Sequence, residues 1–342
     1  MLRLIDANFD RLGEGLRVLE DVARFLLNDA ALCRRLRNLR HKLVKDIVPL
    51  EQGLLAARRV VEDVGAPRRS PVVSDHEDLL ALVAANARRV QESLRVLEEF
   101  ARISNIPVPV KSAKLQQFRF EVYELEQELV SRLLRHDRLG RLSGIYLILD
   151  TAALKGRSEM EVAAQAIRGG ARVIQLRDKK QPRAKLLDIA RGLKGVCADK
   201  GVLFIVNDHL DIALAVGADG LHLGPEDLPL TEARRLLPMD MLIGCSATSV
   251  SQAVRAQSNG ADYVAVGAIY PTLSKKYRLV GLAMLERVKS KVSLPLVAIG
   301  GINHTNVKEV MKAGAASVAV ISAVLGVDDV ERATRKLVAK LR

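Results

Sequence analysis

The hydrophobic positions follow two different patterns along the chain. Up to about residue 140, apolar residues recur every three or four positions over long stretches, which is typical of amphipathic helices. Beyond it, short runs rich in Val, Ile and Leu alternate with amphipathic stretches and are separated by glycines. The pattern predicts an all-helical domain over residues 1–136 and an α/β domain over 143–342, with the boundary within His136–Gly144.

The second half contains eight apolar runs with helical patterns between them. Near-continuous apolar strands are typical of a parallel sheet that helices cover on both faces, and eight such units in about 200 residues favour a closed barrel. The predicted fold class is therefore α/β, a (β/α)8 TIM barrel preceded by the helical domain, with a doubly wound open sheet as the alternative. The predicted strands are 144–150, 172–178, 203–208, 220–224, 242–247, 263–269, 295–301 and 317–324.

The helical half contains an internal duplication. Residues 6–26 align with 84–104 at an offset of 78, and residues 36–43 align with 115–122 at an offset of 79. The repeat predicts a duplicated helical hairpin, such as a four-helix bundle. Polar residues retained in both copies favour a shared buried polar seam or a ligand site. The matched pairs are Asn8 with Asn86, Arg11 with Arg89, Glu14 with Glu92, Arg17 with Arg95, Glu20 with Glu98, and Arg24 with Arg102.

One apolar stripe in each copy is expected to form the core of this bundle. In the first copy Leu12, Leu16, Leu19, Ala23 and Leu26 recur at helical spacing. The second copy has an equivalent stripe, which runs through Val90, Leu94, Leu97 and Ala101.

Composition excludes several classes of protein. The chain has 342 residues, of which 49% are hydrophobic and 27% charged, and its 23 Gly and 11 Pro are too few for a disordered or collagen-like chain. No apolar run approaches the ~18 residues of a membrane span, and the first residues lack the apolar stretch of a signal peptide. Three scattered cysteines exclude a disulfide framework and a zinc site. We expect a soluble, cytoplasmic protein without a membrane partner.

The net charge of +13 lies mostly in the second half. Residues 1–140 carry 24 Lys and Arg against 21 Asp and Glu, giving +3, whereas 141–342 carry 29 against 19, giving +10. Trp is absent and aromatic residues make up 3%, so the stacking surfaces of single-strand binders are missing. We therefore expect anionic small substrates and no nucleic acid. A basic nucleic-acid-binding protein stays as the alternative, which a strong salt dependence of retention would favour.

Polar residues gather where the predicted barrel strands end. Reactive groups of such barrels lie at these carboxyl ends, and Gln175, Arg177 and Lys179 are spaced by two, so they project from one face. The Gly300–Gly301 turn offers bare backbone N–H groups to a phosphate. Each residue alone could belong to a solvated rim or a helix cap, but their convergence favours an anion site. Further candidates are Asn207, Asp208, Glu226, Asp227, Ser246, Thr272, Ser274, Lys275 and Ser322.

Two carboxylates among them indicate a metal. Asp208 and Asp227 offer only oxygen ligands, which suit Mg²⁺ held together with phosphates. With Arg177, Lys179 and Lys275 they imply a diphosphate that is stabilised as it leaves. No Cys–His or Ser–His pair indicates covalent catalysis. The residues alone thus predict a Mg²⁺-dependent reaction of a diphosphate with a second, phosphorylated substrate.

Six ordered motifs resemble the thiamine phosphate synthase family. They are QLRDK (175–179), VNDHLDIALAVGADGLHLGPEDLP (206–229), IGCSATS (243–249), GAIYPTLSK (267–275), AIGGI (298–302) and VISAV (320–324). The resemblance covers residues 143–342. It implies a barrel enzyme that joins hydroxymethylpyrimidine diphosphate to thiazole phosphate and releases pyrophosphate. The family's mechanism is dissociative, since the methylene–diphosphate bond ionises before the thiazole nitrogen attacks.

The resemblance also implies roles for individual residues. One Mg²⁺ would be bound by Asp208 and Asp227. Related thiazole tautomerases have histidine at the position of Thr248, so Thr248 together with Asp208 favours a synthase. Pro225 and Ser274 are mild departures from the family's usual Gln and Thr. The pyrimidine diphosphate would be held by Gln175, Leu176, Arg177, Asp178, Lys179, Asn207, Ser246 and Lys275, of which Arg177, Lys179, Ser246 and Lys275 would be catalytic. The thiazole phosphate would be held by Thr272, Leu273, Ser274, Gly301, Ile321 and Ser322.

The helical half resembles a small domain often fused ahead of these synthases. The matching stretches are residues 5–25 and VEDVG (61–65). The resemblance implies hydroxymethylpyrimidine phosphate kinase activity with ATP as co-substrate. Residues 1–140 lack a GxxxxGK loop, so arginines would have to bind the phosphates. The alternative is a synthase whose helical domain only dimerises or senses a ligand, and a homo-oligomer is left open. The candidates are Arg11, Glu14, Arg17, Asp21, Arg24, Arg40, Asp63, Arg89, Glu92 and Arg95.

Overall fold

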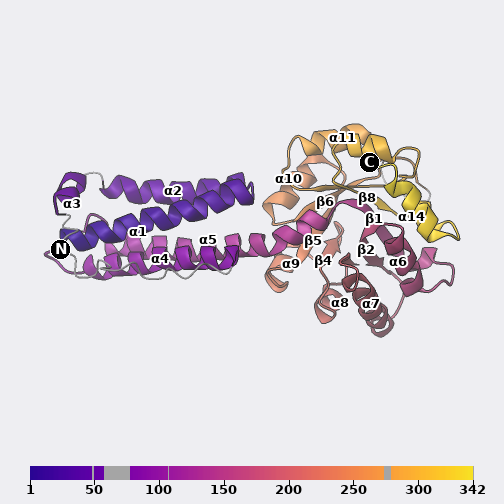
Figure 1. The fold of residues 1–342 in the computed structure, drawn as a ribbon, viewed down its shortest axis with the longest axis horizontal. Coiled ribbons are helices and arrows are strands. Elements are labelled where there is room, and N and C mark those ends of the chain that lie inside the picture. The colour runs from indigo at the N-terminus through magenta and orange to yellow at the C-terminus, as the bar shows by residue number, and fades with distance from the viewer. Residues whose placement is uncertain (48–49, 58–77, 107, 273–278, 342) are drawn as a thin grey trace. The chain divides into compact units, whose positions relative to one another are not determined.

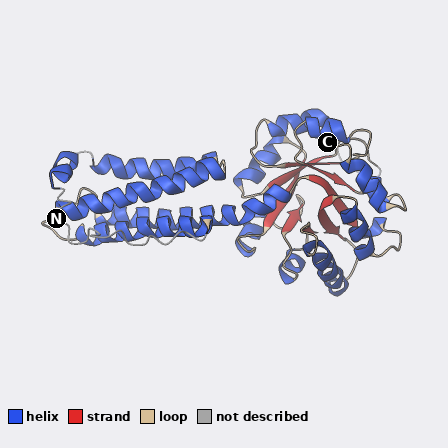
Figure 2. Cartoon of the chain, viewed as in Figure 1, coloured by secondary structure: helices blue, strands red, loops and turns tan. Residues whose placement is uncertain are grey.

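The computed structural model describes residues 1–47, 50–57, 78–106, 108–272 and 279–341. The chain divides into two compact units, Met1–Leu134 and Arg135–Arg342 (Figure 1). Every strand of the described residues lies in the second unit, as the red arrows of Figure 2 show. The stretch around residue 140, expected to be a boundary, continues the last helix of the first half, because α5 extends from Ser112 to Arg141. The change of hydrophobic pattern near residue 140 therefore marks the approach to the first strand, while the helix itself continues to Arg141.

The helical unit is built on four long helices. They are α1 (Leu2–Asp21), α2 (Ala30–Ile47), α4 (Leu79–Phe100) and α5 (Ser112–Arg141), with a short α3 (Glu51–Ala57) after α2. Their apolar stripes form one buried cluster. The predicted duplicated bundle is therefore present, with α1 and α2 repeated as α4 and α5.

The end of the first core stripe departs from the prediction. Leu12, Leu16, Leu19 and Ala23 are buried, but Leu26 is 49% exposed. A π-helical segment, Val22–Leu26, follows α1. A π-helix has more residues per turn than an α-helix, so it rotates Leu26 off the stripe that a constant 3.6-residue period predicts.

A polar seam inside this bundle repeats the duplication. Glu20 and Glu98 are buried, and each pairs with an arginine of the following helix: Arg40 Nη2 lies 3.0 Å from Glu20 Oε2, and Arg119 Nη2 lies 3.2 Å from Glu98 Oε2. These arginines are themselves 79 positions apart, so both members of the pair were copied. The other arginines of the seam are Arg37 beside Glu20, and Arg95 and Arg102 beside Glu98.

The second unit is a closed barrel of eight parallel strands in sequence order, which confirms the predicted TIM barrel. The predicted eighth strand is too long, because Ser322–Leu325 is helical (α13) and a continuous apolar run cannot distinguish the two. The strands are β1 (Gly144–Asp150), β2 (Ala171–Arg177), β3 (Leu203–Asn207), β4 (Gly220–Leu223), β5 (Leu242–Ala247), β6 (Tyr263–Gly267), β7 (Leu296–Ile299) and β8 (Ser317–Val320).

Helices surround this barrel and cover the outward-facing side chains of its strands. None of the helices that the structure describes is long and apolar enough to cross a membrane. The surrounding helices are α6 (Glu159–Arg168), α7 (Arg183–Ala198), α8 (Leu210–Ala215), α9 (Leu230–Leu236), α10 (Val250–Ser258), α11 (Gly281–Lys289), α12 (Val307–Lys312) and α14 (Val330–Val338).

The interior of the barrel has its own core, which closes one end. Leu139 and Leu142, at and just after the end of α5, pack on this interior cluster. Arg135 Nε also lies 2.8 Å from Asp262 Oδ1, which precedes β6. The amino-terminal end of the barrel is therefore filled, and a cavity is left at the carboxyl ends of the strands.

Candidate functional site

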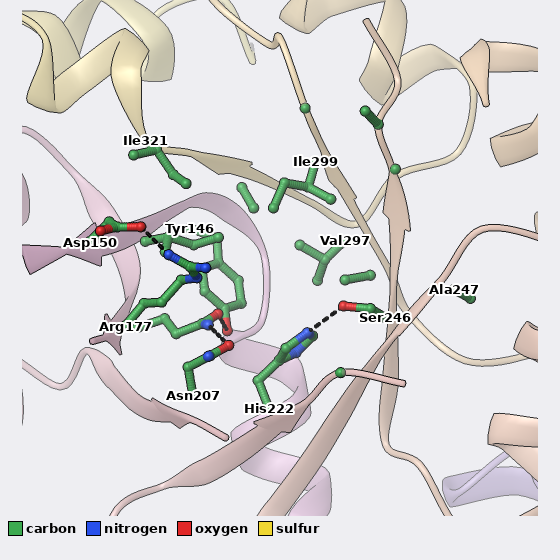
Figure 3. A pocket seen from close by; sticks show the side chains of 18 of the residues that line it. Tyr146, Asp150, Arg177, Asn207, His222, Ser246, Ala247, Val297, Ile299 and Ile321 are labelled. Atoms are coloured by element: carbon green, nitrogen blue, oxygen red, sulfur yellow. Dashed lines mark hydrogen bonds and ion pairs between the residues drawn. The ribbon is translucent and has the colours of Figure 1, made fainter. Parts of the chain in front are cut away.

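A cavity of about 410 Å³ lies at the carboxyl ends of the barrel strands (Figure 3). Leu176 packs in the core between sheet and helices, and the buried Asp178 does not line the cavity. Leu273, Ser274 and Lys275 lie outside the described residues. The predicted residues that line the cavity are Gln175, Arg177, Lys179, Asn207, Asp208, Glu226, Asp227, Ser246, Thr272, Gly300, Gly301, Ile321 and Ser322.

Two cations of β2 and its following loop form the basic side of the cavity. Arg177 forms an ion pair with Asp150 at the end of β1, and Lys179 Nζ lies 3.0 Å from Asp208 Oδ2. Figure 3 shows the Arg177–Asp150 pair beside the open part of the cavity. Asp150 was missed from sequence, although it is the last residue of a strand and so satisfies the same rule that identified the others.

Two carboxylates face each other beside Lys179. Asp208, in the left-handed backbone region at φ 64°, and Asp227 are hydrogen-bonded to each other. Burial raises the pKa of Asp208, but the bonds to Asp227 and Lys179 outweigh it and leave that pKa lowered. Burial and the neighbouring Asp208 both raise the pKa of Asp227. Asp227 is therefore the carboxylate of the pair that takes up a proton first as the pH falls.

This pair fits a magnesium ion. A divalent cation bound between them would remove the repulsion between the two carboxylates. Among the described residues no group of three or more His, Cys, Asp or Glu side chains could hold a metal. Asp208 and Asp227 would thus supply two ligands, and phosphate oxygens and water the others, which is how proteins usually bind Mg²⁺.

The floor of the cavity is a chain of buried hydrogen bonds. Tyr146 OH donates to Gln175 Oε1 at 2.8 Å, and Gln175 Nε2 donates to Asn207 Oδ1 at 2.7 Å. Because the Tyr146 hydrogen is used in this way, its oxygen accepts from Tyr263 OH at 3.0 Å. Gly244 makes room for that ring, since a Cβ there would lie 1.9 Å from Tyr263 Cζ. The donor directions on this side of the floor are therefore fixed.

The same chain continues to Ser246 through a buried histidine. His222 Nδ1 lies 3.2 Å from Tyr263 OH, and its Nε2 lies 3.0 Å from Ser246 Oγ. Burial lowers the pKa of His222 to about 4, so the ring is neutral at neutral pH. With the Tyr263 hydrogen already donated, Nδ1 carries the proton and Nε2 accepts from Ser246. The Ser246 oxygen then offers only lone pairs to the cavity.

Two glycines shape the far side of the rim. Gly300 and Gly301 have φ of 102° and 64°, and a Cβ on Gly301 would lie 2.5 Å from the carbonyl oxygen of Pro271. Only glycine permits both the backbone conformation and this close approach. Gly301 lines the cavity together with Ile321 and Ser322, which follow β8. This is where barrels of this class commonly bind a phosphate group.

Two residues of the floor were also missed from sequence. Tyr146 and Tyr263 were not singled out, although both line the cavity. Their strands read as continuous apolar runs, which hide the inward alternation. That alternation was the available signal, because Tyr146 and Ile148 point inward while Ile145, Leu147 and Leu149 point outward.

The candidates of the helical unit separate into two groups. Arg11, Arg89 and Glu92 line a second cavity, of about 450 Å³, which residues of α1 and α4 form. Arg40 and Arg95 instead belong to the buried seam. Asp63 lies outside the described residues, and neither of these groups includes Glu14, Arg17, Asp21 or Arg24.

Comparison with known proteins gives matches to both halves. The thiamine monophosphate synthase family matches residues 145–324, and the ThiD2 family matches residues 3–128. The chain is 40% identical to a thiamine-phosphate synthase of Thermosynechococcus vestitus, covering 99% of this chain and 94% of the relative. It is 37% identical to that of Gloeobacter violaceus, covering 100% and 97%. Among solved structures, a thiamine phosphate pyrophosphorylase from Pyrococcus furiosus is 39% identical with a TM-score of 0.55, covering 61% of this chain and 97% of that one.

Proposed function

Because the chain belongs to the thiamine monophosphate synthase family, a family of transferases, we propose that its barrel couples hydroxymethylpyrimidine diphosphate to thiazole phosphate. The products are thiamine phosphate and pyrophosphate. The observation that carries this proposal is the convergence of two cations, two facing carboxylates and a glycine turn on one cavity. Such a cavity has room for a leaving diphosphate on one side and a second phosphate on the other.

The cations are placed to bind the leaving group. Arg177 and Lys179 would hold the diphosphate, with Lys275 as a further predicted contact, and each would gain a partner as negative charge develops on the leaving oxygen. Mg²⁺, held by Asp208 and Asp227, would supply further charge neutralisation to the diphosphate. The methylene carbon–oxygen bond breaks, and its electron pair leaves with pyrophosphate. The thiazole nitrogen then donates its own lone pair to the methylene carbon, so no general base is needed.

The floor is suited to the aminopyrimidine ring. Ser246 offers an acceptor to the cavity, which would take a hydrogen from the exocyclic amino group. Gln175 and Asn207 would orient the ring from the other end of the same chain of hydrogen bonds. An amino group held in this way keeps its electron density available to the ring, which supports the cation formed when pyrophosphate leaves.

We further propose that the helical unit phosphorylates hydroxymethylpyrimidine phosphate, with ATP as donor. The match to the ThiD2 family supports this role, and the product would be the diphosphate that the barrel consumes. Because these substrates are phosphate esters, whose charge opposes passage through a membrane, we expect both reactions to take place in the cytoplasm.

One experiment separates the two activities. The full chain is incubated with Mg²⁺ and thiazole phosphate, either with hydroxymethylpyrimidine phosphate and ATP or with the diphosphate and no ATP. Thiamine phosphate in both reactions, with ATP required in the first, is the expected result. Product from the diphosphate alone would refute the kinase and leave a binding or dimerisation module. No product in either would refute the synthase site.

A further inference from the structure

The second cavity lies in the helical unit. It has a volume of about 450 Å³, within the range of small-molecule sites, and it is formed between α1 and α4. The two helices pack closely, because a Cβ on Gly15 of α1 would lie 2.6 Å from Val90 Cγ2 of α4. Gly15 faces Val90 while Asn8 and Ser93 share the cavity, so the helices run antiparallel, as Figure 1 shows.

The charge of this cavity is strongly positive. Arg11, Arg88, Arg89 and Glu92 line it together with the buried Asn8 and Ser93. Three guanidinium groups against one carboxylate leave an excess of two positive charges in a space the size of a small ligand. A phosphate group matches such a set, because each guanidinium can donate two parallel hydrogen bonds to phosphate oxygens.

The arginines that line the cavity differ from those of the buried seam. Within the described residues, Arg11, Arg88 and Arg89 take part in no hydrogen bond or ion pair. Arg95 of α4 and Arg102, which lies just beyond the end of that helix, by contrast both bind Glu98. The donors that line the cavity are therefore available, whereas those of the seam are used by the fold.

Comparison of the two copies shows that the duplication alone does not account for the residues of this cavity. Arg11 and Arg89 are equivalent residues of the two copies, and both face the same cavity. Arg88 has Asp10 as its counterpart, so the second copy has a cation at the cavity where the first copy has a carboxylate in sequence. Fold alone does not require an unpaired arginine at that position.

We propose that the cavity lined by Arg11, Arg88, Arg89 and Glu92 binds the phosphate group of a phosphorylated small molecule. The choice of ligand rests on the proposed kinase function, in which both the pyrimidine phosphate and ATP carry such a group. The shared chemistry is a phosphate ester held by guanidinium forks. Glu92, the single carboxylate among the lining residues, lies where it can accept a hydrogen from a hydroxyl or amine of the same ligand.

Arginine footprinting on the full chain tests the site. Phenylglyoxal modifies exposed arginines, and mass spectrometry measures the modification of each one with hydroxymethylpyrimidine phosphate, ATP, inorganic phosphate or chloride at equal ionic strength. We expect at least a tenfold lower rate at Arg88 and Arg89 with one of the phosphate compounds. Arg34, which is exposed on α2 without a partner in the described residues, should react unchanged. Protection by the pyrimidine phosphate or by ATP identifies the occupant. Equal rates in all solutions, or equal protection by chloride, would overturn the proposal.

Paired variants separate this inference from the kinase itself. Arg88→Gln with Arg89→Gln should lower ATP-dependent product formation at least tenfold and leave synthesis from the diphosphate unchanged, whereas Arg34→Gln should alter neither. If the phosphate compounds protect Arg88 and Arg89 in a wild-type chain that makes no ATP-dependent product, the proposed phosphate site stands and the proposed kinase is refuted. ATP-dependent product that neither shows protection nor responds to the double variant would retain the kinase and refute this site.

Discussion

Two clusters of buried charge, one in each unit, differ in how their members are paired. In the helical unit, Glu98 is fully buried and each of its oxygens has a guanidinium partner. In the barrel, Asp208 and Asp227 face each other, and Asp208 forms an ion pair with Lys179. The charge of Glu98 is therefore compensated within the protein, whereas the charge of the Asp208–Asp227 pair is fully compensated when a cation binds.

This difference separates structural charge from functional charge. A carboxylate surrounded by arginines gains nothing further from a ligand, and its removal leaves arginines without a partner. Two facing carboxylates keep one proton or one metal ion at their shared site, so they retain a binding capacity that the fold does not use. The two clusters should therefore respond to mutation in opposite ways, the barrel pair through activity and the seam through stability.

The largest effect is expected from Asp208→Asn. The side chain keeps its size but loses its charge, and we expect thiamine phosphate formation from the diphosphate to fall about 1000-fold at saturating substrate. The stability of the barrel should change little, because the lost repulsion with Asp227 is offset by the lost ion pair with Lys179. Turnover against Mg²⁺ concentration is the measurement. Asp211→Asn, an exposed position on α8, serves as the control. Wild-type turnover with wild-type Mg²⁺ dependence in Asp208→Asn would show that the pair is not the metal site.

The reverse outcome is expected for Glu98→Ala. Loss of the buried carboxylate leaves Arg119, which is 15% exposed, without its partner, and we expect the helical unit to lose about 3 kcal/mol of stability. Amide hydrogen exchange of α4 and α5 measures the loss, while synthesis from the diphosphate continues. Glu99→Ala is the matched control, because Glu99 is 45% exposed and its ion pairs should contribute well under about 1 kcal/mol. Equal losses in the two variants would refute the distinction between seam and surface.

A third prediction concerns acid stability of the barrel floor. The unfolded chain protonates His222 below its ordinary pKa of 6.5, whereas the folded chain does so only near 4. Between these values the unfolded state binds more protons, so stability falls as the pH falls. Replacing His222 by Gln removes this dependence, and the loss of stability from pH 7 to pH 5 should shrink by about 2 kcal/mol relative to the wild-type protein. Urea unfolding at the two pH values measures it, and an unchanged difference would mean that the ring is already protonated in the fold.

Sequence alone predicted the barrel well because its signals are local. Continuous apolar runs such as 144–150 and 242–247 gave strands with the observed bounds. The rule that strand ends carry the chemistry placed Arg177, Asp208 and Gly301 in one cavity. It could not show that Asp208 contacts Asp227, because that pairing depends on the left-handed backbone at Asp208 and on the following loop.

In the helical unit, the sequence predicts the helices but not the contacts that each arginine makes. Arg11, Arg89 and Arg95 look alike in sequence, each on a helical pattern and within four residues of an acidic residue. Packing between helices decides which of them meet a buried carboxylate and which face a cavity. Arg88 was missed for this reason, since its counterpart Asp10 excludes it from the repeat that drew attention to the others.

The smallest expected effect tests the duplication directly. Asn8 Nδ2 donates to the Leu4 carbonyl at 2.8 Å, and Asn86 Nδ2 donates to the Leu82 carbonyl at 2.9 Å, so the two copies use the same buried hydrogen bond. Replacing either asparagine by Ala should lower the stability of the helical unit by about 1 kcal/mol. Hydrogen exchange in α1 and α4 measures each loss, and the double variant should show their sum if the sites act independently. Unequal losses would show that the copies have diverged here as they have at Arg88, and would place the larger share of the unit's stability in the copy that lost more.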